Sequence, residues 1–95
     1  MPKAYWIANV TVTDPDAYKG YQTIAPAAFA QFGARFLARG DAETLEGNAW
    51  ERRVIIEFPD MDAARACYAS ETYRTARAER AKACTADIAL IEALD

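Results

Sequence analysis

The segment from Ala4 to Val12 constrains the fold most, because its pattern predicts a β-strand that is apolar on both faces. Aromatic and β-branched side chains, which favour strands, dominate it, and a turn signal follows it. Trp6 and Val10 fall on one face of this strand, whereas Tyr5 and Ile7 fall on the other. We therefore expect a strand that is covered on both faces.

A helix is predicted directly after this strand, with Asp14 as its N-cap and Pro15 at its first position. Apolar residues then recur at intervals of three and four as far as Gly33, which is expected to end the helix. Pro26 interrupts the apolar stripe, since proline lacks the backbone donor and crowds the preceding turn. We expect a kink, or a break into two pieces, near Ile24.

Two strands and a hairpin are predicted in the middle of the chain. Apolar and charged side chains alternate over residues 34–39, and residues 40–41 mark a bend after them. A short extended piece over residues 43–46 then meets a turn signal and the strongest strand pattern of the chain, residues 52–58. This arrangement indicates a hairpin.

Two helical segments and a last strand complete the pattern. Asp60 is the predicted N-cap of a short helix over residues 61–68, and Ser70 that of a helix over residues 71–84. The final strand is expected over residues 86–93. With the two helical segments counted together, the order is that of a split βαβ pair. The sequence thus predicts an α+β fold on the ferredoxin-like plan, an antiparallel sheet with helices on one face.

The face of that sheet without helices would carry Tyr5, Ile7, Leu37 and Ile55, which are too apolar to remain in water. Two such sheets packed face to face would cover both patches, and most such associations are twofold. A chain of 95 residues, expected to form one domain over residues 1–95, hides only about two-thirds of its surface when it folds alone. We therefore expect a homodimer, so that the chain's main partner is a second copy of itself.

Composition argues against several classes of function. The chain contains no histidine, which is the usual base of a catalytic triad and the commonest metal ligand. Its two cysteines, Cys67 and Cys84, lack the spacing of a metal or redox motif, so we expect buried, inert thiols, no metal and no cofactor.

Charge and hydropathy bear on partners and location. A net charge of -3 argues against nucleic acid as a partner. No apolar run approaches the roughly 20 residues of a membrane span, so a membrane partner is not expected. The N-terminal stretch lacks the features of a signal peptide, and we expect a cytoplasmic location.

Several short segments, spread along the whole chain, together carry a family resemblance. They are Tyr5-Trp6-Ile7-Ala8, Asp14-Pro15, the run from Gly33 to Gly40, Leu45-Glu46-Gly47, the run from Arg53 to Pro59, and Cys67-Tyr68-Ala69-Ser70. On these segments the chain resembles the bacterial domain-of-unknown-function family 1330, within the dimeric α/β-barrel superfamily. The resemblance implies a ferredoxin-like fold and a dimer, and it supplies no reaction to carry over.

Four charged residues form a first candidate site. Alternation places Arg35 and Arg39 on one face of their strand, and Arg53 and Glu57 on one face of another. Charges on a face that also needs burial require pairing. One interpretation is an Arg–Glu network at the dimer interface. The other is an arginine fork that holds a substrate carboxylate or enolate while Glu57, the candidate catalytic residue, moves a proton.

Tyrosines on the predicted helices form a second candidate site, made of Tyr18, Tyr21, Tyr68 and Tyr73. Aromatic stripes at helical spacing usually belong to the core. Buried hydroxyls need partners, however, so a pocket between helices and sheet that contains several phenols would suit a small polar aromatic ligand. Ser70 is included with them as a candidate ligand-binding residue.

Three functions follow from these patterns. The first is the binding of a small anionic or aromatic molecule in a pocket between helices and sheet. The second is a cofactor-independent enzyme of the monooxygenase or isomerase type, which rests on fold analogy. The third is a purely structural or partner-binding dimer. A cavity lined by arginine and glutamate would favour the first two functions, and a filled interior would favour the third.

Overall fold

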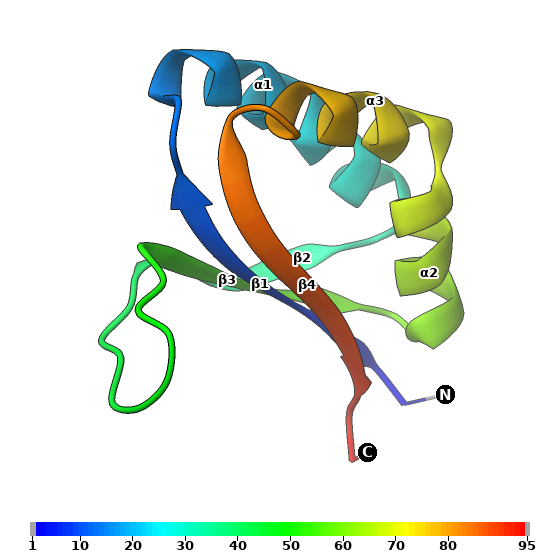
Figure 1. The fold of residues 1–95 in the computed structure, drawn as a ribbon. Coiled ribbons are helices and arrows are strands. Elements are labelled where there is room, and N and C mark those ends of the chain that lie inside the picture. The colour runs from blue at the N-terminus through cyan, green and yellow to red at the C-terminus, as the bar shows by residue number, and fades with distance from the viewer. Residues whose placement is uncertain (1, 95) are drawn as a thin grey trace.

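A computed structural model describes residues 2–94, so the two ends of the predicted domain, residues 1 and 95, lie outside the described residues. The elements are β1 (Ala4–Val12), α1 (Pro15–Gln31), β2 (Arg35–Asp41), β3 (Arg52–Phe58), α2 (Met61–Ala69), α3 (Glu71–Arg80) and β4 (Cys84–Glu92). The strands form an antiparallel sheet in the order β2-β3-β1-β4. All the helices lie on one face of that sheet (Figure 1), which confirms the ferredoxin-like plan.

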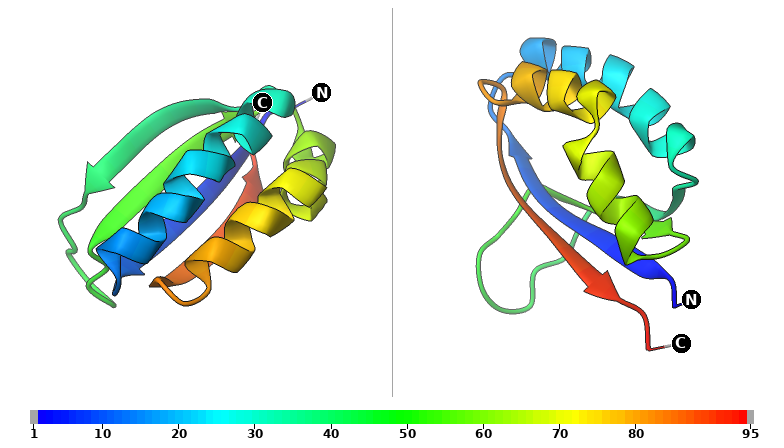
Figure 2. Two further views of the ribbon diagram at one scale, coloured as in Figure 1. Left: turned by 90° about the horizontal axis from the view of Figure 1, so that it is seen from above. Right: turned by 90° about the vertical axis from the view of Figure 1, so that its right-hand side faces the viewer.

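Side-chain caps start each helix at the predicted residue. The bonds run from the Ala17 N–H to Asp14 at 3.2 Å, from the Ala63 N–H to Asp60 at 2.7 Å, and from the Tyr73 N–H to Ser70 at 3.2 Å. Each cap satisfies a donor that the first turn of a helix cannot pair internally. The caps therefore fix where the chain leaves the sheet and enters the helical layer, in which α1 and α3 lie side by side (Figure 2).

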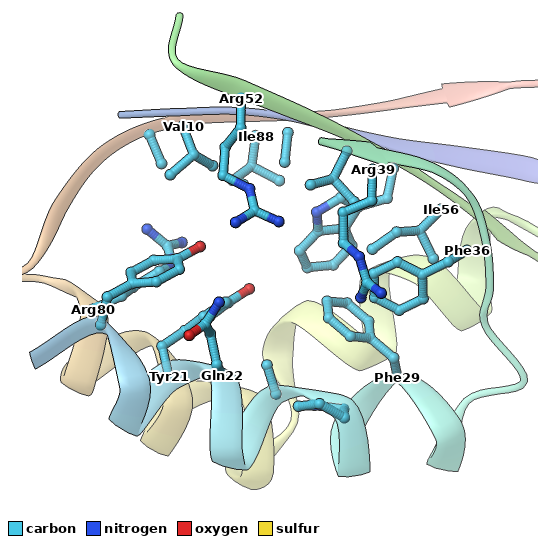
Figure 3. A pocket seen from close by; sticks show the side chains of 17 residues that line it. Val10, Tyr21, Gln22, Phe29, Phe36, Arg39, Arg52, Ile56, Arg80 and Ile88 are labelled. Atoms are coloured by element: carbon cyan, nitrogen blue, oxygen red, sulfur yellow. The ribbon is translucent and has the colours of Figure 1, made fainter. Parts of the chain in front are cut away.

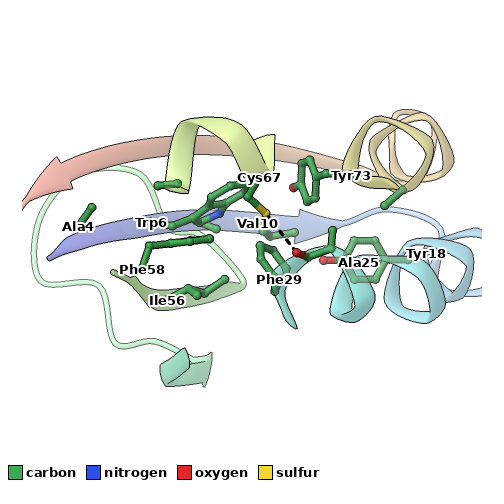
Figure 4. Close-up of a cluster of buried hydrophobic side chains, with 14 of the residues drawn as sticks. Ala4, Trp6, Val10, Tyr18, Ala25, Phe29, Ile56, Phe58, Cys67 and Tyr73 are labelled. Carbon is green, nitrogen blue, oxygen red and sulfur yellow. Dashed lines mark hydrogen bonds between the residues drawn. The ribbon is translucent and has the colours of Figure 1, made fainter. Parts of the chain in front are cut away.

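Trp6 lies at the centre of the core, on the face of β1 that the helices cover (Figure 4). Its ring centroid lies 5.8 Å from that of Phe58 in a stacked arrangement, and 5.2 Å from that of Phe29 in an edge-on one. Tyr73, which is fully buried, meets Trp6 edge-on from α3 at 5.1 Å. Offset and edge-on aromatic pairs of this kind stabilise a core beyond their buried area.

The helix α1 continues through Pro26, so of the two alternatives predicted near Ile24, a kink or a break into two pieces, the break is wrong. Proline removes only one hydrogen bond of the ladder, and α1 packs along α3 on one side. That packing is close enough that a Cβ added at Gly20 would lie 3.3 Å from Glu79 Oε1. Tertiary packing of a helix outweighs the local cost of one unfavourable residue.

The hairpin in the middle of the chain differs from the prediction in its position. Residues 43–46 form no strand, and β2 instead continues through the predicted bend at residues 40–41. Residues 42–51 form the loop that joins β2 to β3. Arg53 on β3 anchors this loop to the sheet, because its Nη2 donates to Thr44 Oγ1 at 3.4 Å and to the Asn48 carbonyl at 3.3 Å.

The last predicted helix is too long. It ends at Arg80, and Cys84 begins β4. The turn between them is anchored because the Ala83 carbonyl accepts from the backbone N–H groups of Thr13 and Asp14, at 2.8 and 3.0 Å. Cys84 is therefore a half-buried strand residue.

Cys67, by contrast, is a buried thiol in α2, as predicted. Its Sγ donates to the Ala28 carbonyl at 3.7 Å, and burial raises the pKa of this thiol to about 11. A thiol with a raised pKa carries little of the reactive thiolate at neutral pH.

The face of the sheet without helices carries an apolar patch, as the sequence predicts. Tyr5 and Ile7 are half-buried at its centre, while Leu37, Ile55 and Ile91 remain 43%, 37% and 55% exposed.

Among residues 2–94, the helices are all too short or too polar to cross a membrane.

Candidate functional site

A β-bulge in β2 decides which face Arg39 occupies. Phe36 pairs with Ile56, but it is Ala38 that pairs with Ile55, so one extra residue lies between them in β2. Arg39 consequently pairs with Val54, on the face that the helices cover. A regular ladder would have set it opposite Arg53 on the other face, so the prediction that Arg35 and Arg39 share a face is wrong.

A cavity of about 410 Å³ lies between the sheet and the helices α1 and α3 (Figure 3). This volume is within the range of small-molecule sites, roughly 300–1,000 Å³. The lining residues are Trp6, Ala8, Val10, Tyr18, Tyr21, Gln22, Ala25, Pro26, Phe29, Phe36, Arg39, Arg52, Val54, Ile56, Arg80, Ala86 and Ile88. Because Gln22, Pro26 and Arg39 are exposed, the mouth of the cavity lies between α1 and β2.

Strand register orders the sheet wall of the cavity into three rows. One row contains Arg52, opposite Val10, and the last contains Ile56, opposite Trp6. Val54 lies in the middle row with Arg39 beside it. Rows on one face are two residues apart, about 7 Å, so the two outer rows are separated by about 13 Å.

Three arginines line the cavity, and among residues 2–94 no aspartate or glutamate does so. Arg52 extends into the cavity from β3, Arg39 extends from β2, and Arg80 lies on the helical side (Figure 3). The guanidinium of Arg39 lies 4.9 Å from the ring centroid of Phe36, and that of Arg80 lies 5.5 Å from that of Tyr21. Stacking of this kind uses the face of a guanidinium and not its hydrogen-bonding edges. The guanidinium of Arg80 also interacts with the hydroxyl of Tyr73.

Two of these arginines have a buried donor without an acceptor. The Nε atoms of Arg52 and Arg80 are both buried, and neither has a hydrogen-bond partner among residues 2–94. Asp41 is the cross-strand neighbour of Arg52, but the two form no ion pair in the described structure. Buried donors of this kind are rare in proteins, and a missing ligand is one physical reason for them.

The helical wall of the cavity contributes phenols that stay protonated. The hydroxyls of Tyr21 and Tyr73 lie 2.9 Å apart in a hydrogen bond between α1 and α3. Burial raises the pKa of both, and it also raises the pKa of Tyr18, which lies near Arg52 and Arg80. At neutral pH these groups act as neutral hydrogen-bonding partners, so the arginines keep their positive charge uncompensated.

The structure brings only part of the predicted site together. Tyr18, Tyr21 and Arg39 line the cavity. Tyr73 lies beneath Tyr21 and does not line it.

The other two helix residues of the predicted site have contacts elsewhere. The ring of Tyr68 packs under Arg77, with its centroid 4.6 Å from the guanidinium carbon. Ser70 caps α3, and its hydroxyl donates to the Cys67 carbonyl at 2.7 Å.

The remaining charged residues of the predicted site lie on the other face of the sheet. Arg35 and Glu57 are cross-strand neighbours there, as the sheet order predicts. The carboxylate of Glu57 forms an ion pair with Lys3 at 3.4 Å. Arg53 holds the β2–β3 loop. The predicted cluster of four charges therefore does not form around Glu57, which lies across the sheet from the cavity.

Sequence reasoning missed Arg52, Arg80 and Gln22 as lining residues. Arg52 shares strand alternation with Val54 and Ile56, which is a signal for the helix-covered face. Arg80 lies at the end of α3, where a cation complements the helix dipole. This role accounts for the residue without a ligand, so the sequence gives no signal that Arg80 lines the cavity.

Solved structures share this fold at low sequence identity. A protein of unknown function from Rhodopseudomonas palustris, RPA0582, has a TM-score of 0.82 at 18% identity, covering 99% of this chain and 84% of the other. The cofactor-independent oxygenase SnoaB from Streptomyces nogalater has a TM-score of 0.71 at 17% identity, covering 100% and 96%. A dimeric ferredoxin-like protein of unknown function from Thermobifida fusca has a TM-score of 0.68 at 18% identity, covering 97% and 92%.

At such identities the solved structures establish the fold alone, and no functionally curated protein matches the chain. The family profile described as "Domain of unknown function (DUF1330)" matches residues 3–94. Since this match spans nearly the whole sequence, the chain belongs to the DUF1330 family, as its motifs predict.

Proposed function

We propose that this protein binds a small organic anion in the cavity between the sheet and the helices α1 and α3. The observation that carries the proposal is the presence of three arginines around one cavity that no carboxylate side chain of the described residues lines. The chain as a whole has a net charge of -3, so this concentration of positive charge is local. Guanidinium groups in a partly dry site hold anions by strong, charge-assisted hydrogen bonds.

The apolar part of the lining suits a flat, aromatic ligand. Trp6, Phe29 and Phe36 form one end of the cavity, with the Phe29 and Phe36 rings edge-on at 5.5 Å. Ligand sites are commonly built in this way, from apolar walls and a few polar groups that fix orientation. The open volume argues against a purely structural role, for which a filled interior would be expected.

Thermal shift measurements with a set of aromatic anions test the binding proposal. Each anion is compared with a neutral molecule of the same shape, at low and at high salt. We expect the anions to raise the melting temperature with increasing concentration, and less so at high salt. The double variant Arg52→Gln/Arg80→Gln should lose this response, whereas Arg74→Gln, on the exposed part of α3, should keep it. Equal shifts from the neutral molecules would contradict the proposal.

We propose further that the protein acts in the cytoplasm as a homodimer, joined through the sheet face that carries Tyr5, Ile7 and Ile55. Exposed apolar area on this face and the description of similar structures as dimeric support the assembly. Light scattering at micromolar concentration should give twice the chain mass of 10.5 kDa. Ile7→Lys, at the middle of this face, should shift the mass toward one chain, and a monomeric wild type would contradict the dimer.

A second candidate function is cofactor-independent oxygenation, which the likeness to SnoaB favours. Arginines around the cavity would stabilise an enolate or phenolate, the form of a substrate that can react directly with O2. In such a step a CH2 group becomes a carbonyl, and the second oxygen atom leaves as water with both hydrogens. Oxygen uptake with a bound phenol would support this function, and its absence would leave binding alone. In the part of the chain that the structure describes, no carboxylate side chain lines the cavity to serve as base, so binding is the first proposal.

A further inference from the structure

We infer that the cavity binds an aromatic carboxylate in one fixed direction, with the acid group between Arg52 and Arg80 and the ring toward Trp6 and Phe36. This inference rests on the proposed binding function and adds to it the chemical class and the orientation of the ligand. It follows from how the polar and apolar groups are distributed along the cavity.

One end of the cavity is built for the acid group. Arg52 enters from the sheet and Arg80 from α3, so an anion between them would contact two cations from opposite walls. The Nε atom of each is buried without an acceptor. The Nε and Nη donors of a guanidinium lie on one edge and match the two oxygens of a carboxylate. Tyr18 also lines the cavity, and its neutral hydroxyl, which interacts electrostatically with both arginines, adds a hydrogen-bonding group.

The other end of the cavity is built for the ring. Trp6 and Ile56 form the row farthest from Arg52, about 13 Å along the sheet. Phe29 stands edge-on to both Trp6 and Phe36, at 5.2 and 5.5 Å. Phe36, which is 38% exposed, offers the accessible aromatic surface at this end, and a ligand ring would pack against it.

Arg39 belongs to the ring end in this arrangement. It lies in the middle row, and its guanidinium already stacks over Phe36 at 4.9 Å. Its Nε is absent from the buried, unpartnered donors, and the residue is exposed at the mouth. Arg39 would therefore contact the face of the ligand ring by stacking, while Arg52 and Arg80 neutralise the acid.

Calorimetric titration with 2-naphthoate and its neutral primary amide, 2-naphthamide, tests the inference. We expect the carboxylate to bind at least about tenfold more tightly than the amide. Arg52→Gln and Arg80→Gln should each weaken naphthoate by about tenfold and leave naphthamide nearly unchanged. Arg39→Gln should weaken both compounds by a similar, smaller factor. Arg74→Gln, away from the cavity on α3, controls for a general loss of positive charge.

The outcomes separate the direction of the ligand from the existence of the site. If Arg39→Gln abolishes the preference for naphthoate while Arg52→Gln and Arg80→Gln retain it, the inferred direction is wrong. If neither compound binds the wild type at millimolar concentration, the binding function itself fails for this class.

A nuclear magnetic resonance measurement on the wild type keeps the test valid even if a variant fails to fold. Titration with naphthoate should shift the arginine Nε–H signals of Arg52 and Arg80, and naphthamide should not. Signals of these two groups that stay unchanged on saturation with naphthoate would overturn the inference.

Discussion

The hydroxyl oxygens of Tyr21 and Tyr73 lie 2.9 Å apart and join α1 to α3 beneath the cavity. Tyr73 is fully buried, so its hydroxyl has little access to water. Arg80 lies over the ring of Tyr21, and this pair of phenols therefore supports one of the arginines that we assign to the ligand. Loss of the bond would leave a buried polar group without its partner.

Tyr73→Phe should lower the free energy of unfolding by about 1–2 kcal/mol, because it leaves the Tyr21 hydroxyl without its hydrogen-bond partner while preserving the ring contacts with Trp6. Urea denaturation measures this change. Tyr68→Phe removes the same atom from a residue whose hydroxyl has no hydrogen bond among residues 2–94, so it should change stability much less. Equal losses in the two variants would mean that the bond between the phenols adds nothing to stability.

Alkaline pH should destabilise the protein. Burial raises the pKa of Tyr18, Tyr21 and Tyr73, and it raises that of Cys67 from 9.0 to about 11. The phenols and the thiol therefore lose their protons at lower pH in the unfolded chain than in the folded one. As pH rises, the unfolded chain binds fewer protons than the folded chain. Stability is full below the unfolded pKa values and falls above them. Urea melts between about pH 8 and pH 11 should show this decline.

Cys67→Ala measures how much the Cys67 thiol contributes to this dependence of stability on pH. The variant should be less stable at every pH because of the lost side chain, but its stability should fall less steeply over the window from 9.0 to about 11. An unchanged slope would show that Cys67 releases its proton equally easily in both states.

Local sequence signals predicted the parts of the fold that short-range chemistry determines. Asp14, Asp60 and Ser70 were found as caps because each places an oxygen next to unpaired N–H groups, whatever the rest of the chain does. The faces of β1 followed from simple alternation, since its ladders with β3 and β4 are regular. The family, the sheet and the helix-covered face were therefore all accessible from the sequence.

The site was harder to predict because it depends on contacts between distant segments. One extra residue in β2 places Arg39 on the helix-covered face instead of the opposite face, and no residue pattern within β2 predicts that bulge. Arg80 reaches the cavity only because α3 lies beside α1 over the sheet. Residues 43–46 were expected to be extended, but with no partner strand they form part of a loop.

Pro26→Ala should raise the free energy of unfolding by about 1–3 kcal/mol, because α1 is already continuous and alanine restores a donor for the Gln22 carbonyl. Pro15→Ala is the matched control. At the first position of α1 the missing N–H has no acceptor within the helix, so that change should give no stabilisation. If Pro26→Ala is neutral or destabilising in urea melts, the proline is supported by contacts at the cavity mouth that outweigh the hydrogen bond.

Deletion of Leu37 should preserve both the fold and the ligand response. The pairs Phe36–Ile56 and Ala38–Ile55 flank the bulge, so removing the residue between them leaves a regular ladder with Arg39 still opposite Val54. The melting temperature and the affinity for naphthoate should therefore stay close to those of Leu37→Ala, which loses the side chain but keeps the bulge. A large loss of affinity in the deletion alone would show that the twist imposed by the bulge, rather than the register, aims Arg39 at the cavity.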